Sequence, residues 1–426
     1  MWASAPNDDR SQRGDSGSGG SEGGDLTLSF GEAIDLLFPR TAERNKWSLG
    51  PTTALLEELG HPERHFRAIH IGGTNGKGSV AVMVCEALRA AGHRTGLYTS
   101  PHLVDVRERM IVDGQPITEQ AFAMWTERLL PVIEASGASF FEATTAIAFA
   151  DFAARGVELA VVEVGLGGRL DATNVLDPLV SAVTNVAREH TDYLGDELEG
   201  IAREKAGIAK RGRPFVVGEG NSELADVLVV TALEAGAIPV TVPPDAVYPA
   251  ALGLRGPHQR RNAAIAKAVL EAVAESVAVP DVALERGFRV AHLPARLERC
   301  GRWVFDVAHN AAATEALVRA LGADPPPEPL HALVGILRDK DWPTMLRLLG
   351  QLVDRMWLTV APSAPAERRW DVYVAAGECG RNTVAAPDFD LALERVQEGA
   401  ATVLVTGSFY TVGDALVRLP GFRPLG

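Results

Sequence analysis

A glycine-rich segment at residues 71–79 has the composition of a phosphate-binding loop. It reads IGGTNGKGS, so small residues let several backbone N–H groups converge on one point, and Lys77 adds a full positive charge. The segment departs from the usual GxxxxGK[ST] pattern, because Ile71 takes the first glycine position and Gly78 separates Lys77 from Ser79. A simple glycine turn at a strand end is the competing interpretation. We predict nucleotide binding, because a buried strand precedes the segment and an amphipathic helix follows it.

Two further polar side chains are expected at the same edge of a sheet. Glu163 lies in a buried strand at residues 159–164, and His190 follows the next strand, at residues 179–186. Ligands of α/β proteins bind at the carboxyl ends of parallel strands, where a carboxylate can hold a Mg²⁺ ion that bridges phosphates. Glu163 could instead cap the loop that follows it, and a lone histidine is more often structural. Their neighbouring positions favour a shared metal site.

The elements around these residues alternate between strands and helices. Residues 66–99 read as strand, glycine-rich turn, helix and strand, with apolar residues every three or four positions from Val80 to Ala91 and Gly92 as the stop signal. Further short strands separated by helical segments are expected at residues 159–164, 179–186 and 214–218. The pattern predicts a doubly wound, mostly parallel α/β sheet around a P-loop, with helices on both faces.

A second alternation begins near residue 293. It predicts strands at residues 303–307, 331–336, 356–360 and 402–406, and helices at residues 312–321, 342–352 and 412–419. A stiff polar loop at residues 324–329 does not interrupt the alternation. We therefore expect three parts: a disordered Gly- and Ser-rich tail (1–25), a nucleotide-binding domain (26–292) and a smaller Rossmann-like α/β domain (293–426).

Composition and charge exclude several classes of protein. The 426 residues include 41 Lys and Arg and 55 Asp and Glu, and the net charge of −14 disfavours nucleic-acid or anionic-membrane partners. Cys85, Cys300 and Cys379 are far apart without a CxxC pair, so we expect no disulfide framework, no zinc site and a reducing cytoplasm. No apolar stretch approaches the ~20 residues that span a bilayer, and the N-terminus lacks an apolar signal core.

The chain also contains, in this order, the motifs GTNGKGS, TSPHL, FFEATT, EVGLGGRLDATN, EHTDYLG, EKAGI and DVAHN. Together they resemble the folylpolyglutamate synthase and dihydrofolate synthase family, which belongs to the Mur-type amide ligases. The resemblance extends from about residue 30 to the last predicted helix. It implies a nucleotide-binding central domain and a glutamate-ligase domain. It also implies that ATP phosphorylates a carboxylate of a folate or dihydropteroate and that the amine of L-glutamate then displaces the phosphate.

The resemblance further implies roles for individual residues. ATP would be bound by Thr74, Asn75, Gly76, Lys77, Gly78, Ser79, Asn262, Arg296 and Asp306. Magnesium, expected at two sites, would be held by Ser100, Glu163, His190 and Lys205. The folate or pteroate would be contacted by Phe141, Glu142, Ala143, Thr144, Leu170, Asp171 and Ala172. L-Glutamate would be contacted by His309, Ser408 and Tyr410, and the catalytic residues would be Lys77, Lys205 and His309.

Several of these assignments come from the resemblance alone. Lys205 matches a lysine that is carbamylated in relatives, where added CO₂ turns an ammonium into an anionic oxygen ligand. From the residues alone, an exposed helical lysine beside Glu204 is the competing interpretation. Asn262 could be a helix N-cap, and the Phe pair at residues 140–141 could be core. His190 is a softer ligand than Mg²⁺ prefers, so the resemblance carries that assignment too.

Two rival functions share parts of this pattern. Mur ligases of cell-wall synthesis carry an additional nucleotide-sugar domain before the loop, for which residues 26–70 are too few. A nucleotide-gated binding or regulatory protein would turn over ATP without needing a folate and glutamate. The resemblance implies a monomeric ligase, and it leaves open whether dihydropteroate, reduced folates or both are the substrate.

Overall fold

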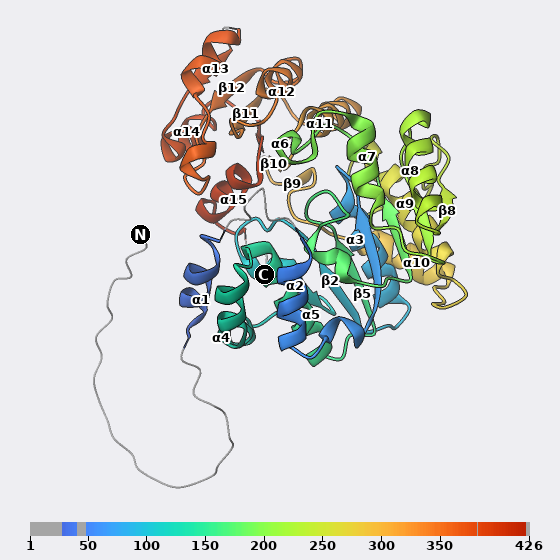
Figure 1. Ribbon diagram of the computed structural model, residues 1–426. Coiled ribbons are helices and arrows are strands. Elements are labelled where there is room, and N and C mark those ends of the chain that lie inside the picture. Colours follow the sequence, from blue (N-terminus) through green and yellow to red (C-terminus); the bar gives the residue numbers. More distant parts are fainter. Residues whose placement is uncertain (1–27, 41–47, 381, 423–426) are drawn as a thin grey trace, which may run out of the picture.

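Two sheets, built from different parts of the chain, form the framework of the protein (Figure 1). The computed structural model describes residues 28–40, 48–380 and 382–422, so the tail expected at residues 1–25 lies outside the described residues. In this part of the chain, eight strands form one sheet, in the order β4-β3-β2-β5-β1-β6-β7-β8. Six strands form the other sheet, in the order β13-β12-β11-β14-β10-β9.

The larger sheet is parallel except at one edge. Its strands are β1 (Arg67–Gly72), β2 (Thr95–Tyr98), β3 (Met110–Val112), β4 (Gln115–Pro116), β5 (Leu159–Glu163), β6 (Val180–Val183), β7 (Pro214–Val217) and β8 (Ile238–Thr241). β1 lies near the centre, paired in parallel with β5 and β6, and only the pairs β2–β3 and β3–β4 at one edge are antiparallel. Ile71 of β1 lies opposite Glu163 of β5, so the phosphate loop starts beside the end of β5.

Helices cover both faces of this sheet. They are α1 (Phe30–Leu37), α2 (Gly50–Glu58), α3 (Lys77–Ala90), α4 (Glu119–Ser136), α5 (Phe140–Ala154), α6 (Thr191–Leu194), α7 (Leu198–Ala206), α8 (Ser222–Glu234), α9 (Pro257–Ala272) and α10 (Asp281–Val290). Side chains of β1 alternate between the faces: Ile69 and Ile71 pack with α3, α9 and α10, whereas Ala68 packs with α1, α2, α4 and α5. α7 and α8 complete the second face.

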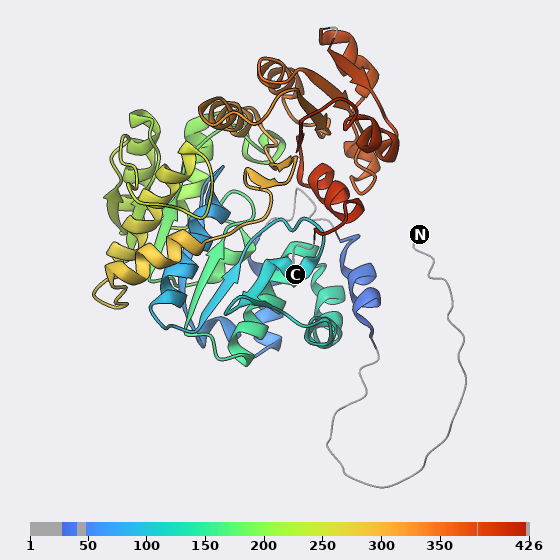
Figure 2. The same ribbon diagram turned by 180° about the vertical axis from the view of Figure 1, so that it is seen from behind.

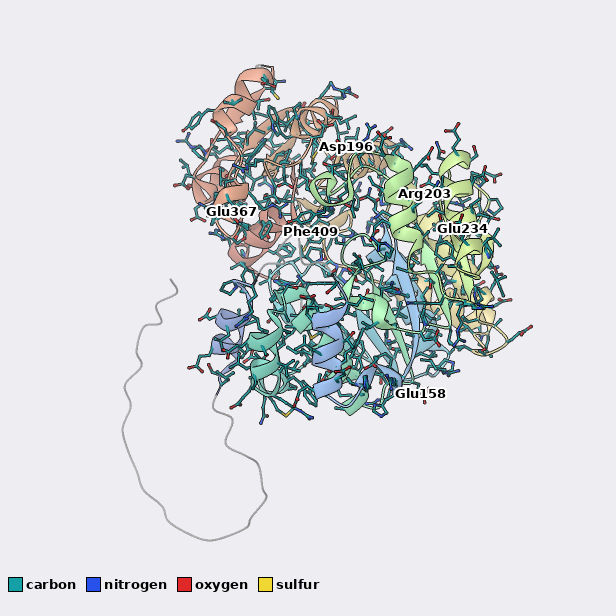
Figure 3. The ribbon with its side chains drawn as sticks, in the orientation of Figure 1. Glu158, Asp196, Arg203, Glu234, Glu367 and Phe409 are labelled. Atoms are coloured by element: carbon teal, nitrogen blue, oxygen red, sulfur yellow. The ribbon has the colours of Figure 1, made fainter. Side chains whose placement is uncertain are left out.

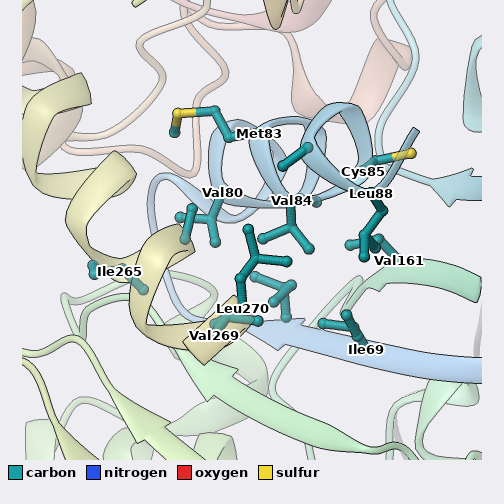
Figure 4. Close-up of a cluster of buried hydrophobic side chains, with 14 of the residues drawn as sticks. Ile69, Val80, Met83, Val84, Cys85, Leu88, Val161, Ile265, Val269 and Leu270 are labelled. Carbon is teal, nitrogen blue, oxygen red and sulfur yellow. The ribbon is translucent and has the colours of Figure 1, made fainter. Parts of the chain in front are cut away.

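Helix α3 has the apolar face that its sequence predicts. Val80, Val84 and Leu88 recur every four residues and are fully buried, and Figure 4 shows them above Ile69 of β1. Burying one such side chain contributes about 1.5–3 kcal/mol. The helix ends at Ala90, and Gly92, with a φ of +94°, lets the chain turn towards β2. Packing thus fixes α3 on the sheet, and with it the loop that opens the helix.

The smaller sheet repeats the same plan. Its strands are β9 (Glu298–Cys300), β10 (Trp303–Phe305), β11 (Leu330–Val334), β12 (Arg355–Leu358), β13 (Thr383–Ala385) and β14 (Thr402–Thr406), and only β9 is antiparallel. Its helices are α11 (Ala311–Ala323), α12 (Trp342–Leu349), α13 (Val372–Glu378), α14 (Phe389–Arg395) and α15 (Phe409–Arg418). α11, α12 and α13 cover one face, and α14 and α15 cover the other.

The predicted fold class, a doubly wound and mostly parallel sheet followed by a smaller α/β domain, is confirmed. Several elements end earlier than predicted: β10 ends at Phe305, and β11 and β12 end at Val334 and Leu358, each two residues before the predicted bound. The strand expected at residues 179–186 ends at Val183, because Thr184 turns its hydroxyl to Asn75 O of the loop, at 2.7 Å. The helix expected at residues 342–352 ends at Leu349, where Gly350 caps it. None of the helices in the described residues has the length and apolar character needed to cross a membrane.

The two domains touch at the carboxyl ends of their strands. Figures 1 and 2 show α6 of the first domain beside the second sheet, and α15 of the second domain beside the first. At one contact, Gly413 of α15 lies so close to the backbone carbonyl of Leu103 that an added Cβ would collide with it. The loops that follow the strands of one sheet therefore face those of the other.

Candidate active site

The phosphate loop joins β1 to α3 in a conformation that requires glycine. Gly73 and Gly76 have φ angles of +133° and +82°. A Cβ on Gly73 would collide with the Thr184 side chain, and one on Gly76 would lie 2.7 Å from Asn262 Oδ1. The loop is therefore pressed between β6 and α9, and it opens directly into the 14-residue helix α3. Free backbone N–H groups at such a helix start favour an anion.

Lys77 is the first residue of α3, and its ammonium folds back over the loop. Lys77 Nζ donates a hydrogen bond to Thr74 O at 2.9 Å, and the side chain stays partly exposed. Its positive charge opposes the rise in the pKa of Glu163 and contributes to lowering the pKa of Lys205. The ammonium therefore lies among the ionisable groups that the sequence assigned to phosphate and metal binding.

Glu163, at the end of β5, is buried beside the loop. Its side chain is 5% exposed, and Ser100 donates its backbone N–H to Glu163 Oε2 at 3.0 Å. A Cβ on Gly78 of the loop would lie 3.3 Å from the same oxygen. Burial raises the pKa of Glu163, although the charge of Lys77 and the hydrogen bond from Ser100 each act to lower it. This hydrogen bond joins Glu163 to Ser100, not to the loop after β5, so the geometry does not support the capping interpretation.

His190 stands in the loop between β6 and α6. Its backbone is left-handed, with a φ of +52°, directly before α6. The pKa of His190 is lowered to about 3, mainly by burial. The charges of Lys340 and Lys77 also lower it, whereas the carboxylate of Glu189 raises it. Neutral imidazole is the form that ligates metals. Among the described residues, no group of three or more His, Cys, Asp or Glu side chains could hold a metal, so the expected magnesium set depends on the Ser100 hydroxyl as well.

Lys205 is buried, which contradicts the interpretation as an exposed helical lysine. The side chain is 4% exposed, and Lys205 Nζ donates to Gly73 O of the phosphate loop at 3.0 Å. Burial and, to a smaller extent, the charge of Lys77 together lower its pKa to about 7, although Glu189 and Asp171 oppose the shift. A neutral amine, unlike an ammonium, can react as a nucleophile at this pKa. The neighbouring Glu204 pairs instead with Arg169, at 3.0 Å.

Asn262 lies inside α9, so the N-cap interpretation of this residue is wrong. The helix begins at Pro257 after Gly256, and buried Asn262 donates to Gln259 Oε1 at 2.9 Å while its own oxygen rests on Gly76. A cavity of about 200 Å³ opens at the start of this helix. It is lined by Pro257, His258, Ala316, Arg319 and Ala320, from α9 and α11. The phosphate loop, α9 and the second domain thus meet here.

Arg296 and Asp306 come together at the entrance of the second domain. Asp306 accepts the backbone N–H groups of Leu297 and Ala308, at 2.8 and 2.9 Å. Burial raises the pKa of Asp306 against the attraction of Arg296. The Arg296 guanidinium lies 5.2 Å from the ring centroid of Phe409, which Figure 3 labels at the junction of the domains. The sequence assigned both charged residues to ATP, and the structure brings them close enough for each charge to influence the pKa of the other.

The segments assigned to the folate are mostly turned inward. Phe141 packs its ring on the backbone of Gly165, after β5, and Leu170 is partly exposed. The carboxylate of Glu142 accepts from the backbone and hydroxyl of Ser139, both at 2.7 Å, in a capping box that starts α5. Little exposed surface remains on the other four residues, which are Ala143, Thr144, Asp171 and Ala172.

An aromatic cluster that the sequence did not single out lies beside these segments. The ring of Phe140 lies 5.4 Å from that of Phe38, which is 53% exposed, and 6.4 Å from that of His102. Arg109 donates to His102 Nδ1 at 2.9 Å and lies 5.2 Å from the Phe140 centroid. Only TSPHL hinted at His102, because the other three residues come from three separate segments.

The residues assigned to glutamate lie on the second domain. His309 places Nδ1 2.9 Å from Val307 O and Nε2 2.7 Å from Glu189 Oε1 of the first domain. Lys340 Nζ stands 4.0 Å from the same carboxylate oxygen. Ser408 is buried at the start of α15, where it accepts the N–H of Thr411 at 3.1 Å, and Tyr410 is partly buried. Glu189 and Lys340 were missed from the sequence, because their partners are distant in the chain.

Comparisons with known proteins match both domains. Residues 71–236 match the family model of the Mur ligase middle domain, and residues 295–409 match that of the Mur ligase glutamate ligase domain. The Bacillus subtilis "Dihydrofolate synthase/folylpolyglutamate synthase" is 32% identical, over 88% of this chain and 95% of that protein. The Mycobacterium tuberculosis folylpolyglutamate synthase, solved with ADP and AMPPCP, has a TM-score of 0.82 at 32% identity, covering 92% of this chain and 99% of that one.

A third relative is a longer protein. The Haloferax volcanii "Probable bifunctional folylpolyglutamate synthase/dihydropteroate synthase" is 34% identical over 91% of this chain but only 50% of its own length. The chain therefore spans about half the length of this relative, and nearly all of the Bacillus protein.

Proposed function

Because the chain belongs to the folylpolyglutamate synthase and dihydrofolate synthase family of Mur ligases, we propose that it uses ATP to join L-glutamate to the carboxylate of a folate or dihydropteroate. One observation carries the proposal: in the first domain Lys205 donates to Gly73 O of the phosphate loop, and Glu189 of the same domain contacts His309 of the second domain. An acid group and an amino acid could meet only in such a shared space.

The ATP would lie along the loop and reach the second domain. Its phosphates would contact the backbone of residues 74–79 and the ammonium of Lys77. The purine would lie near Asn262, whose amide oxygen lies against Gly76 of the loop, and Arg296 and Asp306 would offer a cation for a phosphate and an anion for ribose hydroxyls.

The donor set around Glu163 fits a hard cation that shares phosphate oxygens. The buried carboxylate of Glu163, the hydroxyl of Ser100 and the neutral imidazole of His190 would hold Mg²⁺, which would neutralise phosphate charge. Lys205 does not fit as an ammonium. Its pKa of about 7 supports carbamylation, because CO₂ adds to a neutral amine and the product is an anionic oxygen ligand for a second ion.

The chemistry then follows from charge. A carboxylate is a poor electrophile because its charge is delocalised, and phosphorylation gives it a leaving group. The amine of glutamate attacks the acyl carbon, its nitrogen–carbon bond forms, and inorganic phosphate leaves as the amine loses a proton. Lys77 would neutralise the transferred phosphate, and His309, the start of α15 at Ser408, and Tyr410 would hold the glutamate.

The folate would enter over Phe141 and Leu170, the two assigned side chains with exposed apolar surface. The partly buried Glu142 and the buried Ala143, Thr144, Asp171 and Ala172 would then shape this wall rather than touch most of the ligand. The neighbouring ring of Phe140 supports an aromatic surface for a pterin or its benzoyl group.

The remaining proposals concern organisation. Residues 26–292 would form the ATP-binding central domain and residues 293–426 the glutamate-ligase domain. The protein would act as a cytoplasmic monomer, without nucleic-acid or membrane partners, in keeping with its net charge of −14.

The direct test is to follow ADP release with and without each substrate. We expect ADP only when a pteroate-type acid and L-glutamate are both present, and a glutamylated product of the corresponding mass. ADP release at an equal rate without either substrate would instead indicate a nucleotide-gated protein. Rates with dihydropteroate and with tetrahydrofolate, measured side by side, distinguish the two synthase activities.

A further inference from the structure

A pair of asparagines joins the phosphate loop directly to the second domain. Asn310 Nδ2 donates to Asn75 Oδ1 at 3.0 Å, and Asn75 Nδ2 donates to Asn310 Oδ1 at 3.3 Å. Asn75 belongs to the loop after β1, and Asn310 follows β10, 235 residues further along the chain. Two donors and two acceptors are matched, so the contact has a defined geometry.

The same Asn310 side chain starts helix α11. Ala313 donates its backbone N–H to Asn310 Oδ1 at 2.8 Å, which makes Asn310 the N-cap of this 13-residue helix. Because the N-cap requires Oδ1 of Asn310 to accept the Ala313 N–H, the orientation of the side-chain amide is fixed. Nδ2 of Asn310 is therefore the atom that donates to Asn75. Asn310 is only 6% exposed, so water competes little for these bonds. A shift of Asn75 would consequently act on the first turn of α11.

On the other side, the backbone of Asn75 is tied to the first sheet. Asn185 Oδ1 accepts the Asn75 N–H at 2.9 Å, and Asn185 Nδ2 and Thr184 Oγ1 both donate to Asn75 O, at 2.9 and 2.7 Å. The main chain at this point is therefore fixed to the residues after β6. Its side-chain amide is the part of Asn75 that reaches the other domain.

The residue next to Asn310 makes the second contact between the same segments. His309 lies 2.7 Å from Glu189 Oε1, which belongs to the loop after β6. Two consecutive residues of the second domain thus hold two loops of the first domain, one of which is the phosphate loop. This arrangement would place His309 correctly only when the loop is in the conformation that Asn310 accepts.

We propose that Asn310 is a positioning residue that couples occupancy of the phosphate loop to the placement of α11 and His309. This inference rests on the proposed function for the identity of the loop's ligand, and it adds a residue that the motifs did not assign. Asn310 acts through Asn75 and needs no contact with a substrate of its own.

Hydrogen exchange in the presence of AMPPNP and Mg²⁺ tests the coupling without any ligation. In the wild type we expect slower exchange both in residues 73–79 and in residues 308–314. In Asn310→Ser the loop should still be protected, whereas residues 308–314 should exchange as in the ligand-free protein, because serine keeps the cap but is too short to reach Asn75. Protection of residues 308–314 in this variant, or its absence in the wild type, would overturn the proposal.

Asn221→Ser is the matched control. Asn221 caps α8, also a helix of 13 residues, by accepting the Leu224 N–H at 3.1 Å, and it is exposed. This variant should lose similar stability and keep both protected segments. If Asn221→Ser also uncouples residues 308–314, the effect comes from general loosening and not from the asparagine pair.

A double-mutant cycle gives the second readout. We expect Asn310→Ser to lower kcat for glutamate-dependent ADP release about tenfold, which corresponds to about 1.4 kcal/mol, with the KM for ATP changed less than about twofold. Asn75→Ala with Asn310→Ser should be no slower than Asn75→Ala alone. Losses that multiply would show that the residues act separately. If the wild type shows no glutamate-dependent ADP release, the proposed function fails while the exchange experiment still decides the coupling.

Discussion

Buried polar side chains at the carboxyl ends of the strands find different hydrogen-bond partners in the two sheets. At the larger sheet, Glu163 and Lys205 are almost fully buried. Glu163 accepts a hydrogen bond from the uncharged backbone N–H of Ser100, and Lys205 donates one to the backbone carbonyl of Gly73. At the smaller sheet, Asp306 accepts two backbone N–H groups, and Asn310 and Ser408 each cap a helix of their own domain. The first edge buries charge with little compensation, whereas the second is largely satisfied from within.

The difference indicates which domain depends on ligands. Burying a charge without a close partner costs several kcal/mol, so the pKa of each group moves towards its neutral form. Burial raises the pKa of Glu163 and lowers that of Lys205, as this cost predicts. Metal and phosphate charges would offset the cost at the larger sheet. At the smaller sheet, two backbone N–H groups and the charge of Arg296 already oppose the rise that burial causes in the pKa of Asp306, so less of the cost is left to a ligand.

The largest effect is expected at Lys77. Lys77→Ala should reduce ligation by at least about 10²–10³-fold, because a full charge is removed from the site of phosphate transfer. The fold should survive, since the hydrogen bond that Lys77 Nζ donates goes to Thr74 O of its own loop. Initial rates and a thermal melt measure both outcomes.

Lys267→Ala is the control for this change. Lys267 lies on α9 and pairs with Glu271 on the surface. Its loss should leave the rate within about twofold, because exposed ion pairs contribute about 0–1 kcal/mol. Insoluble Lys77→Ala protein would mean that the loop lysine is needed for folding. It would contradict the conclusion that the charged groups at the edge of the larger sheet serve a ligand.

Glu163→Gln should separate stability from activity. The raised pKa of Glu163 stabilises the ligand-free fold below its ordinary value of 4.5, and this contribution is lost as the pH rises through the folded pKa. Glutamine carries no charge, so at neutral pH the ligand-free variant should melt at a higher temperature than the wild type. Activity should fall about 10²-fold.

Added Mg²⁺ and ADP complete this experiment. Adding Mg²⁺ and ADP should raise the melting temperature of the wild type more than that of Glu163→Gln, because only the wild type has a buried charge for the metal to neutralise. At pH 4.5 the advantage of the ligand-free variant should shrink. Equal gains in both proteins would show that Glu163 does not face the metal, and the contrast between the edges would lose its electrostatic basis.

The sequence predicted the elements well because their signals are local. The period of α3 and the alternation of strands follow from neighbouring residues, and even β14 (Thr402–Thr406) has the predicted bounds. Glycine requirements at Gly73 and Gly76 also follow from the loop motif. Some bounds shifted beside a distant partner, as where Thr184 bonds to the loop after β6 ends, and others shifted at a local stop such as Gly350.

The site was less predictable, because its contacts join distant segments. Burial of Lys205 depends on Gly73, 132 residues away, and nothing near EKAGI distinguishes it from a surface lysine. Glu189 and Lys340 meet His309 only across the domains. Conversely, the capping box of Glu142 is visible in the spacing Ser139-x-x-Glu142, a local signal that the motif resemblance obscured.

The smallest effect is expected at Ser408, on the satisfied edge. Ser408→Ala should lower stability by about 1 kcal/mol through loss of the α15 cap, as Ser29→Ala should at the cap of α1, remote from the site. Since Ser408 Oγ already contacts Thr411, at 2.9 Å, we expect the KM for glutamate to rise less than about tenfold, through displacement of the helix start. Chemical denaturation and initial rates measure the two. A hundredfold rise in KM at unchanged stability would mean that the hydroxyl binds glutamate directly, and that the smaller sheet, like the larger one, keeps its polar groups for a ligand.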